Sequence, residues 1–104
     1  MLPMRPVLLF VPLLAMAAPA WGAINCYKPN KTGVETLICS NDRVAAADEQ
    51  MAVAFRDAFL RSRDKDALVK EQDEWRRNVR DACNDVPCLL RAFQQRTSEL
   101  ETYY

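Results

Sequence analysis

The four cysteines, Cys26, Cys39, Cys83 and Cys88, carry the most distinctive chemistry in this sequence of 104 residues. A thiolate metal site uses paired C-x-x-C spacing or histidines, and the sequence has neither. Four thiols in a short chain with an export signal predict two disulfides. We favour the local pairs Cys26–Cys39 and Cys83–Cys88, the second of which would lock a helix corner. Crossed pairing of Cys26 with Cys83 or Cys88 remains open, since four cysteines allow three connectivities.

Catalytic side chains are scarce in the sequence. There is no histidine, which removes the commonest general base and the usual partner of a nucleophilic serine or cysteine. Gly22 and Gly33 are the only glycines, so a glycine-rich phosphate loop is excluded. Glu35 and Asp48 are candidates for a glycosidase-like carboxylate pair, but nothing in the sequence forces them around one cleft. We therefore expect a protein that is not an enzyme and that uses no cofactor or metal ion.

Three polar residues, Asp48, Gln72 and Arg96, lie on otherwise apolar helix stripes, and Gln72 lies one turn before Trp75. Buried polar groups need hydrogen-bond partners. An ion pair between Asp48 and Arg96, with Gln72 bonded to nearby backbone or to the Trp75 indole N–H, would satisfy all of them. These residues are predicted to form a core network that fixes helix register. A binding pocket lined by the same groups is the alternative.

The tyrosines Tyr27, Tyr103 and Tyr104 are candidates for an interface anchor, since tyrosine is enriched at protein interfaces. Fraying of a chain end would also leave Tyr103 and Tyr104 exposed. The sequence alone therefore leaves the partner-binding residues unknown.

Helical periodicity predicts the elements that must position these side chains. Residues 24–33 are rich in Asn, Pro and Gly and are expected to be extended and turn-rich. A short helix then runs from Thr32 or Gly33 to Cys39. The next helix is expected to begin at Ser40 or Asn41 as its N-cap. Its apolar residues recur at helical spacing: Val44, Ala47, Met51, Phe55 and Phe59.

A break is expected at residues 61–66, which contain no apolar side chain. The stripe beyond it is about one residue out of phase with the first, and a turn would let both stripes face one core. Ser62 or Asp64 is expected to cap that second long helix, which ends near Cys83. Its stripe is Leu68, Gln72, Trp75, Val79 and Ala82.

Asp85 is expected to cap the last helix, with Pro87 in its first turn. Its stripe is Leu89, Phe93, Arg96, Leu100 and Tyr104. The predicted fold is therefore all-α. We expect one domain over residues 23–104, a small, disulfide-stapled, antiparallel helical bundle with a short N-terminal helix and three longer helices.

Residues 1–22 are predicted to be a signal peptide that is cleaved on export. Arg5 is their only charge, residues 7–18 are almost entirely apolar, and small residues follow at the expected cut after Gly22 or after Ala20. The apolar run is shorter than the ~20 residues that span a bilayer. We therefore expect a periplasmic or secreted product.

Net charge argues against one class of partner. Removal of residues 1–22 takes away Arg5, one of the 14 basic residues, and none of the 14 acidic residues, which leaves a formal net charge of −1. There is no basic excess to hold a phosphate backbone, so nucleic acid is not an expected partner. Asn25 precedes Cys26 where a lipid-attachment site needs a small residue, so no stable membrane anchor is expected either.

The order and spacing of several motifs resemble one known family. After the leader and Cys26 come Glu35-Thr36-Leu37-Ile38-Cys39, Val44, Asp48, Gln72-x-x-Trp75, Cys83, Cys88-Leu89, Phe93, Arg96 and Leu100. Residues 24–101 are similar to the LprI-type lysozyme inhibitor domain. Phe93 and Val44 replace the usual Tyr and Leu of that pattern. Val79, with Arg80 beside it, stands where members tend to carry an Arg.

The resemblance implies a secreted or periplasmic helical domain that inhibits lysozyme or a related muramidase. Animal lysozymes of the common type are strongly basic, and an inhibitor gains association rate from a complementary acidic surface. A net charge of −1 provides little overall attraction to a basic enzyme. A local acidic patch could provide that attraction instead: Asp64, Asp66, Glu71, Asp73 and Glu74. The alternatives are a cell-envelope structural or interaction protein that acts on a different partner, for example by neutralising another toxin, and a small hydrolase that uses Glu35 and Asp48.

Overall fold

The computed structural model describes residues 22–104, so the predicted signal peptide lies outside the described residues apart from Gly22. The elements in chain order are α1 (Gly33–Cys39), α2 (Asp42–Arg61), α3 (Lys65–Trp75), the π-helix η2 (Arg76–Arg80) and α4 (Val86–Glu101). This part of the chain contains no strand, which confirms the all-α prediction.

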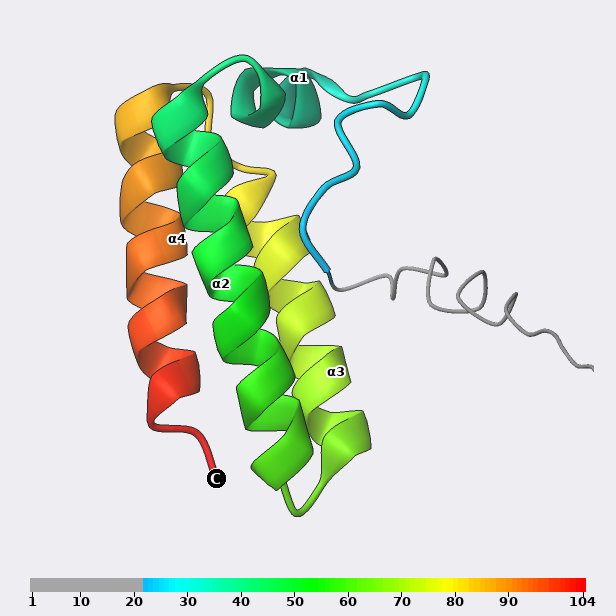
Figure 1. The fold of residues 1–104 in the computed structure, drawn as a ribbon, viewed down its shortest axis with the longest axis vertical. Coiled ribbons are helices and arrows are strands. Elements are labelled where there is room, and N and C mark those ends of the chain that lie inside the picture. Colours follow the sequence, from blue (N-terminus) through cyan, green and yellow to red (C-terminus); the bar gives the residue numbers. More distant parts are fainter. Residues whose placement is uncertain (1–21) are drawn as a thin grey trace, which may run out of the picture.

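The three long helices lie side by side, and α1 lies across one end of them (Figure 1). α2 leads away from α1, α3 returns along it, and α4 runs in the same direction as α2. Consecutive long helices are therefore antiparallel, as predicted. The lead-in segment, which we define as residues 22–32, projects from the side of the bundle near α1.

Each α-helix begins at a side chain that accepts hydrogen bonds from the first turn. Thr32 and Glu35 form a reciprocal capping box at α1, in which Glu35 N donates to Thr32 Oγ1 over 3.1 Å and Thr32 N donates to Glu35 Oε1 over 2.9 Å. Asn41, Asp64 and Asp85 cap α2, α3 and α4. These caps place the helix starts within the ranges that the sequence predicts.

The hydrophobic core lies between α2, α3 and α4, with α1 closing one end. α2 ends at Arg61 and α3 begins at Lys65, so the predicted break is confirmed. The turn lets the stripes of both helices reach the same core. The largest fully buried side chains are Phe55, Phe93, Ile38, Leu68, Leu89 and Leu100.

Two disulfides fix the ends of α1 and α4. Cys26 is bonded to Cys39, and Cys83 is bonded to Cys88. This is the local pairing, and it leaves no cysteine free. The first bond ties the lead-in segment to the last residue of α1, and the second closes the corner between η2 and α4.

The π-helix η2 departs from the single helix that was predicted over this stretch. Asp81 N donates to Arg76 O over 2.9 Å, a bond that spans five residues instead of four. The extra residue in the turn rotates the downstream residues by about 100°. Val79 and Ala82, predicted on the buried stripe, are therefore exposed, whereas Arg80 is only 7% exposed.

Candidate partner-binding site

A cavity of about 460 Å³ lies between the lead-in segment, α2, α3 and η2. It gathers residues that are far apart in sequence and includes three of the four members of the predicted polar network. Arg96, the fourth member, is not on its wall. The polar and aromatic side chains used below are Lys28, Glu35, Asp48, Gln72, Trp75 and Arg80.

Asp48 holds the lead-in segment against α2. Its side chain is 4% exposed, and its Oδ2 accepts a hydrogen bond from Ile24 N over 2.9 Å. Burial raises the pKa of Asp48 above its usual value, although the Ile24 hydrogen bond and the charge of Arg80 act in the opposite direction. The predicted Asp48–Arg96 ion pair is therefore wrong, because α2 presents Asp48 to the lead-in segment and Arg96 is bonded to α3.

Gln72 and Arg96 form the polar network inside the core. Arg96 Nε donates to Gln72 Oε1 over 2.8 Å, and Gln72 Nε2 donates to Met51 Sδ over 3.0 Å. Gln72 thus bonds a guanidinium and a sulfur, not the backbone or the Trp75 indole as predicted. The Trp75 ring packs against Phe93 with ring centroids 5.7 Å apart. Gln72 therefore belongs to a hydrogen-bond network in the core and also lines the cavity.

Arg80 is the cavity residue that sequence periodicity missed. It is buried, and its Nε donates to Asp81 Oδ1 over 2.8 Å. Helical spacing from Trp75 pointed to Val79, the position where the related pattern carries an Arg. Because of the π turn, η2 presents the neighbouring Arg80 to the cavity instead. Arg80 stands directly beside Val79 in the sequence, and this was the signal that could have identified it as the cavity residue.

Glu35 links α1 to the lead-in segment. Lys28 Nζ lies 2.8 Å from Glu35 Oε2, while Thr32 N bonds the other carboxylate oxygen. The Lys28 hydrogen bond is the main reason that the pKa of Glu35 is lowered, and burial partly opposes it. Both members of the predicted carboxylate pair, Glu35 and Asp48, therefore line one cavity, and each is bonded to the lead-in segment.

Replacing Lys28 with Met should raise the pKa of Glu35 toward its ordinary value of 4.5. A carboxyl group whose folded pKa is lowered stabilises the fold above pH 4.5, and this contribution is lost as the pH falls below 4.5 through the folded pKa. Lys28→Met should therefore lower the melting temperature at neutral pH, and the difference should vanish once Glu35 is protonated in both proteins.

An NMR titration of the Glu35 carboxyl group and thermal unfolding from acid to neutral pH measure this effect. Lys70→Met, on the exposed face of α3, is the matched control and should leave the Glu35 pKa unchanged. An unaltered Glu35 pKa in Lys28→Met would contradict the assigned ion pair.

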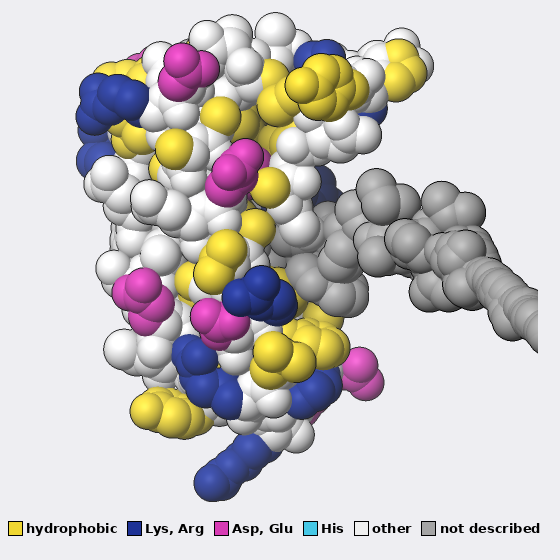
Figure 2. Space-filling view, viewed as in Figure 1, with side chains coloured by type: hydrophobic (Ala, Val, Ile, Leu, Met, Phe, Trp, Pro, Cys, Tyr) yellow, Lys and Arg dark blue, Asp and Glu magenta, His cyan; other side chains and the backbone are white. Residues whose placement is uncertain are grey.

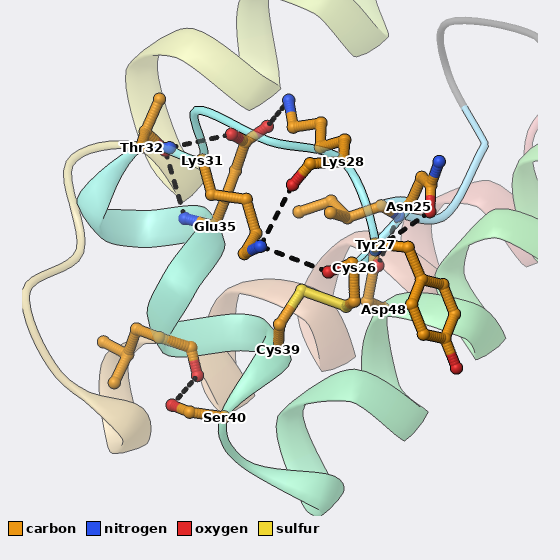
Figure 3. The surroundings of a disulfide bond; sticks show 12 residues. Asn25, Cys26, Tyr27, Lys28, Lys31, Thr32, Glu35, Cys39, Ser40 and Asp48 are labelled. Carbon is orange, nitrogen blue, oxygen red and sulfur yellow. Dashed lines mark hydrogen bonds and ion pairs between the residues drawn. A yellow bond between two sulfur atoms is a disulfide. The ribbon is translucent and has the colours of Figure 1, made fainter.

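The three tyrosines differ in how the fold uses them. Tyr103 is partly buried, and its hydroxyl donates to Glu71 Oε2 over 3.1 Å. Tyr104 is 84% exposed, and the Arg61 guanidinium lies 6.0 Å from its ring centroid. Tyr27 is 96% exposed, and its ring points away from the side chains that hold the lead-in segment (Figure 3).

Three of the five residues of the predicted acidic patch on α3 have partners within the protein. Asp73 is paired with Arg76 over 2.6 Å, Glu71 accepts the Tyr103 hydroxyl, and Asp64 caps the helix. Figure 2 shows acidic and basic side chains interspersed over the face in view, without a block of one sign. A broad acidic surface is therefore not present on this face.

Neither a metal-ligand cluster nor a membrane-spanning helix occurs in the described part of the chain. Residues 22–104 contain no group of three or more carboxylate or thiolate ligands that could hold a metal ion. Every helix in that range is too short or too polar to cross a bilayer.

These features define a small helical protein stapled by two disulfides, with a cavity and a tied, projecting segment beside it. Residues 25–100 match the family model described as lysozyme inhibitor LprI, and the chain belongs to this family. No curated protein and no solved structure matches the chain significantly.

Proposed function

We propose that this protein is exported, loses residues 1–22, and inhibits a lysozyme by binding it with residues 23–32 of the lead-in segment and the adjoining cavity rim. The observation that carries the proposal is the match of residues 25–100 to a family of lysozyme inhibitors. The matched range includes all four cysteines and most of the cavity wall.

Export is supported by the cysteines and by the leader pattern. All four cysteines are paired, and such bonds persist in oxidising compartments such as the periplasm or the extracellular space. Lysozyme acts on the cell wall in those same compartments. An inhibitor exported to the same compartment meets lysozyme without further transport.

Inhibition is also compatible with the chemistry of the cavity. Blocking an enzyme requires a complementary surface and no catalytic group of its own. The carboxylates of Glu35 and Asp48 are both bonded within the protein, where they organise the lead-in segment. Their arrangement supports a structural role in a binding surface.

A titration of an animal lysozyme of the common type, acting on bacterial cell walls, tests the proposal. The inhibitor is the oxidised protein. It is expressed with its own leader, exported, and purified from the compartment that it reaches. We expect a dose-dependent loss of lysis, and mass spectrometry of the exported protein should show cleavage after Gly22 or Ala20. Full activity of several lysozyme types in micromolar excess of the protein would contradict the proposal and favour the cell-envelope alternative.

A further inference from the structure

The lead-in segment combines an unusually exposed aromatic ring with an unusually well-tied backbone. We define the Tyr27 loop as residues 25–31. Among the described large hydrophobic side chains, Tyr27 has the highest exposed fraction that we find, 96%. The ring therefore contributes almost nothing to the core, and its position needs another explanation.

The backbone on both sides of Tyr27 is fixed by local hydrogen bonds. Asn25 Oδ1 accepts from Tyr27 N over 3.0 Å, and Asn25 O accepts from Lys28 N over 3.2 Å. Asn30 has a φ of 59°, in the left-handed region that asparagine tolerates better than most residues. The loop is thus a defined turn and not an extended linker.

Longer-range bonds tie the same loop from the inside. The Lys31 ammonium donates to Cys26 O over 3.2 Å and to Lys28 O over 3.1 Å, which clamps the two ends of the loop together. The Cys26–Cys39 disulfide and the Lys28–Glu35 ion pair then attach it to α1. Figure 3 shows these contacts on one side of the loop and the Tyr27 ring pointing away from them.

A loop held in this way is suited to binding. Ordering a flexible loop at an interface costs free energy, and a loop that is already ordered avoids much of that cost. Tyrosine presents a large, amphipathic surface with only two side-chain torsions, and it is enriched among residues that dominate binding energy. Tyr27 therefore has the properties of an interface anchor.

Charge indicates the kind of surface that the loop fits. Residues 22–34 contain Lys28 and Lys31 and no acidic residue, so the loop together with Glu35 carries a net charge of +1. Lysozyme-type glycosidases hold two carboxyl groups beside the scissile bond, in a cleft shaped for sugar rings. Lys28 and Lys31 lie on the side of the loop opposite the Tyr27 ring (Figure 3), so the net charge only assists the approach to such a cleft. The exposed six-membered ring is the group whose shape fits the cleft.

We propose that the Tyr27 loop enters the substrate cleft of a lysozyme, with the exposed Tyr27 ring in a sugar-binding subsite. This inference rests on the proposed function and names its contact element. Tyr27 would then block the cleft directly, while Lys28 and Lys31 hold the loop in place from its other side.

The test compares inhibition constants for exported, oxidised wild type, Tyr27→Ala, Tyr27→Phe and Tyr104→Ala against the same lysozyme. Tyr104→Ala is the matched control, because it removes another highly exposed tyrosine outside the loop. Tyr27→Ala should weaken inhibition at least about tenfold, whereas Tyr27→Phe keeps the ring and should stay within a few-fold of wild type. Circular dichroism should show unchanged melting temperatures, since the Tyr27 side chain is not packed.

Each outcome bears on a separate claim. Wild-type inhibition that Tyr27→Ala leaves unaltered would overturn the loop inference and leave the proposed function standing. Equal losses in Tyr27→Ala and Tyr104→Ala would overturn the specific role of the loop. No inhibition by the wild type would overturn the proposed function and, with it, this inference.

Discussion

Reduction of both disulfides should unfold the protein under conditions in which the oxidised form is stable. A chain of this size buries a small core, so its stability without cross-links is marginal. The Cys26–Cys39 bond closes a separation of 13 residues and is worth about 3 kcal/mol by loop entropy. The Cys83–Cys88 bond closes a separation of 5 and is worth about 2 kcal/mol. Thermal unfolding followed by circular dichroism, with and without excess reductant, measures the combined effect.

A paired replacement separates stability from function at the first disulfide. Cys26→Ser with Cys39→Ser removes only that bond and should lower the free energy of unfolding by about 3 kcal/mol. It should also weaken lysozyme inhibition at temperatures where the variant is still folded, because the Tyr27 loop loses its attachment to α1. For the reduction experiment on the wild-type protein, a melting temperature that excess reductant leaves unchanged would show that the two disulfides do not stabilise the fold.

Gln72→Leu should be among the most destabilising single substitutions outside the apolar core. Arg96 is 7% exposed, and Gln72 provides the acceptor for its Nε. The Nη2 of Arg96 already lacks a partner among the described residues. The Nη1 of Arg96 bonds the half-exposed Glu99 over 3.2 Å. Removing Gln72 would leave a buried charge poorly satisfied, at a cost of about 2–4 kcal/mol. Urea unfolding gives the measurement.

The double variant Gln72→Leu with Arg96→Met distinguishes this explanation from simple loss of packing. Removing the charge along with its acceptor should recover part of the lost stability, which gives a favourable coupling energy in a double-mutant cycle. Gln94→Leu, at an exposed position on α4, is the matched control and should stay within about 0.5 kcal/mol of wild type. Strictly additive effects in the cycle would contradict the network.

Local signals in the sequence were sufficient for the starts of the α-helices and for the turn between α2 and α3. Asn41, Asp64 and Asp85 are the caps, and the change from apolar to charged residues at 61–66 marks the turn between α2 and α3. These features depend on side chains within one turn of the backbone that they satisfy. Residue types and spacing therefore carry the information directly.

Features that depend on tertiary contacts could not be read in the same way. The π turn at η2 changes which residue faces inward, and a period of 3.6 residues cannot indicate where an extra residue will be accommodated. Val79 was therefore predicted to be buried in place of Arg80. The Asp48–Arg96 pairing failed for a related reason, because Asp48 is used by Ile24, a residue 24 positions away.

The candidate site combines predictable and unpredictable parts. Asp48, Gln72 and Trp75 were recognised as polar or aromatic residues on buried stripes, and the structure brings them to one cavity. The sequence could not show that the lead-in segment forms the facing wall, or that Lys31 clamps the Tyr27 loop. These contacts fix the backbone that carries Tyr27, so the exposed ring has a defined position.

Titration calorimetry of the oxidised, exported protein into an animal lysozyme tests the central claim most directly. The experiment is done with the lysozyme cleft empty and with the cleft filled by a chitin oligosaccharide. Our account predicts one-to-one binding to the empty enzyme and strongly weakened binding to the filled enzyme. Absence of binding heat with the empty enzyme would contradict lysozyme inhibition, and equal binding in both cases would contradict entry of the Tyr27 loop into the cleft.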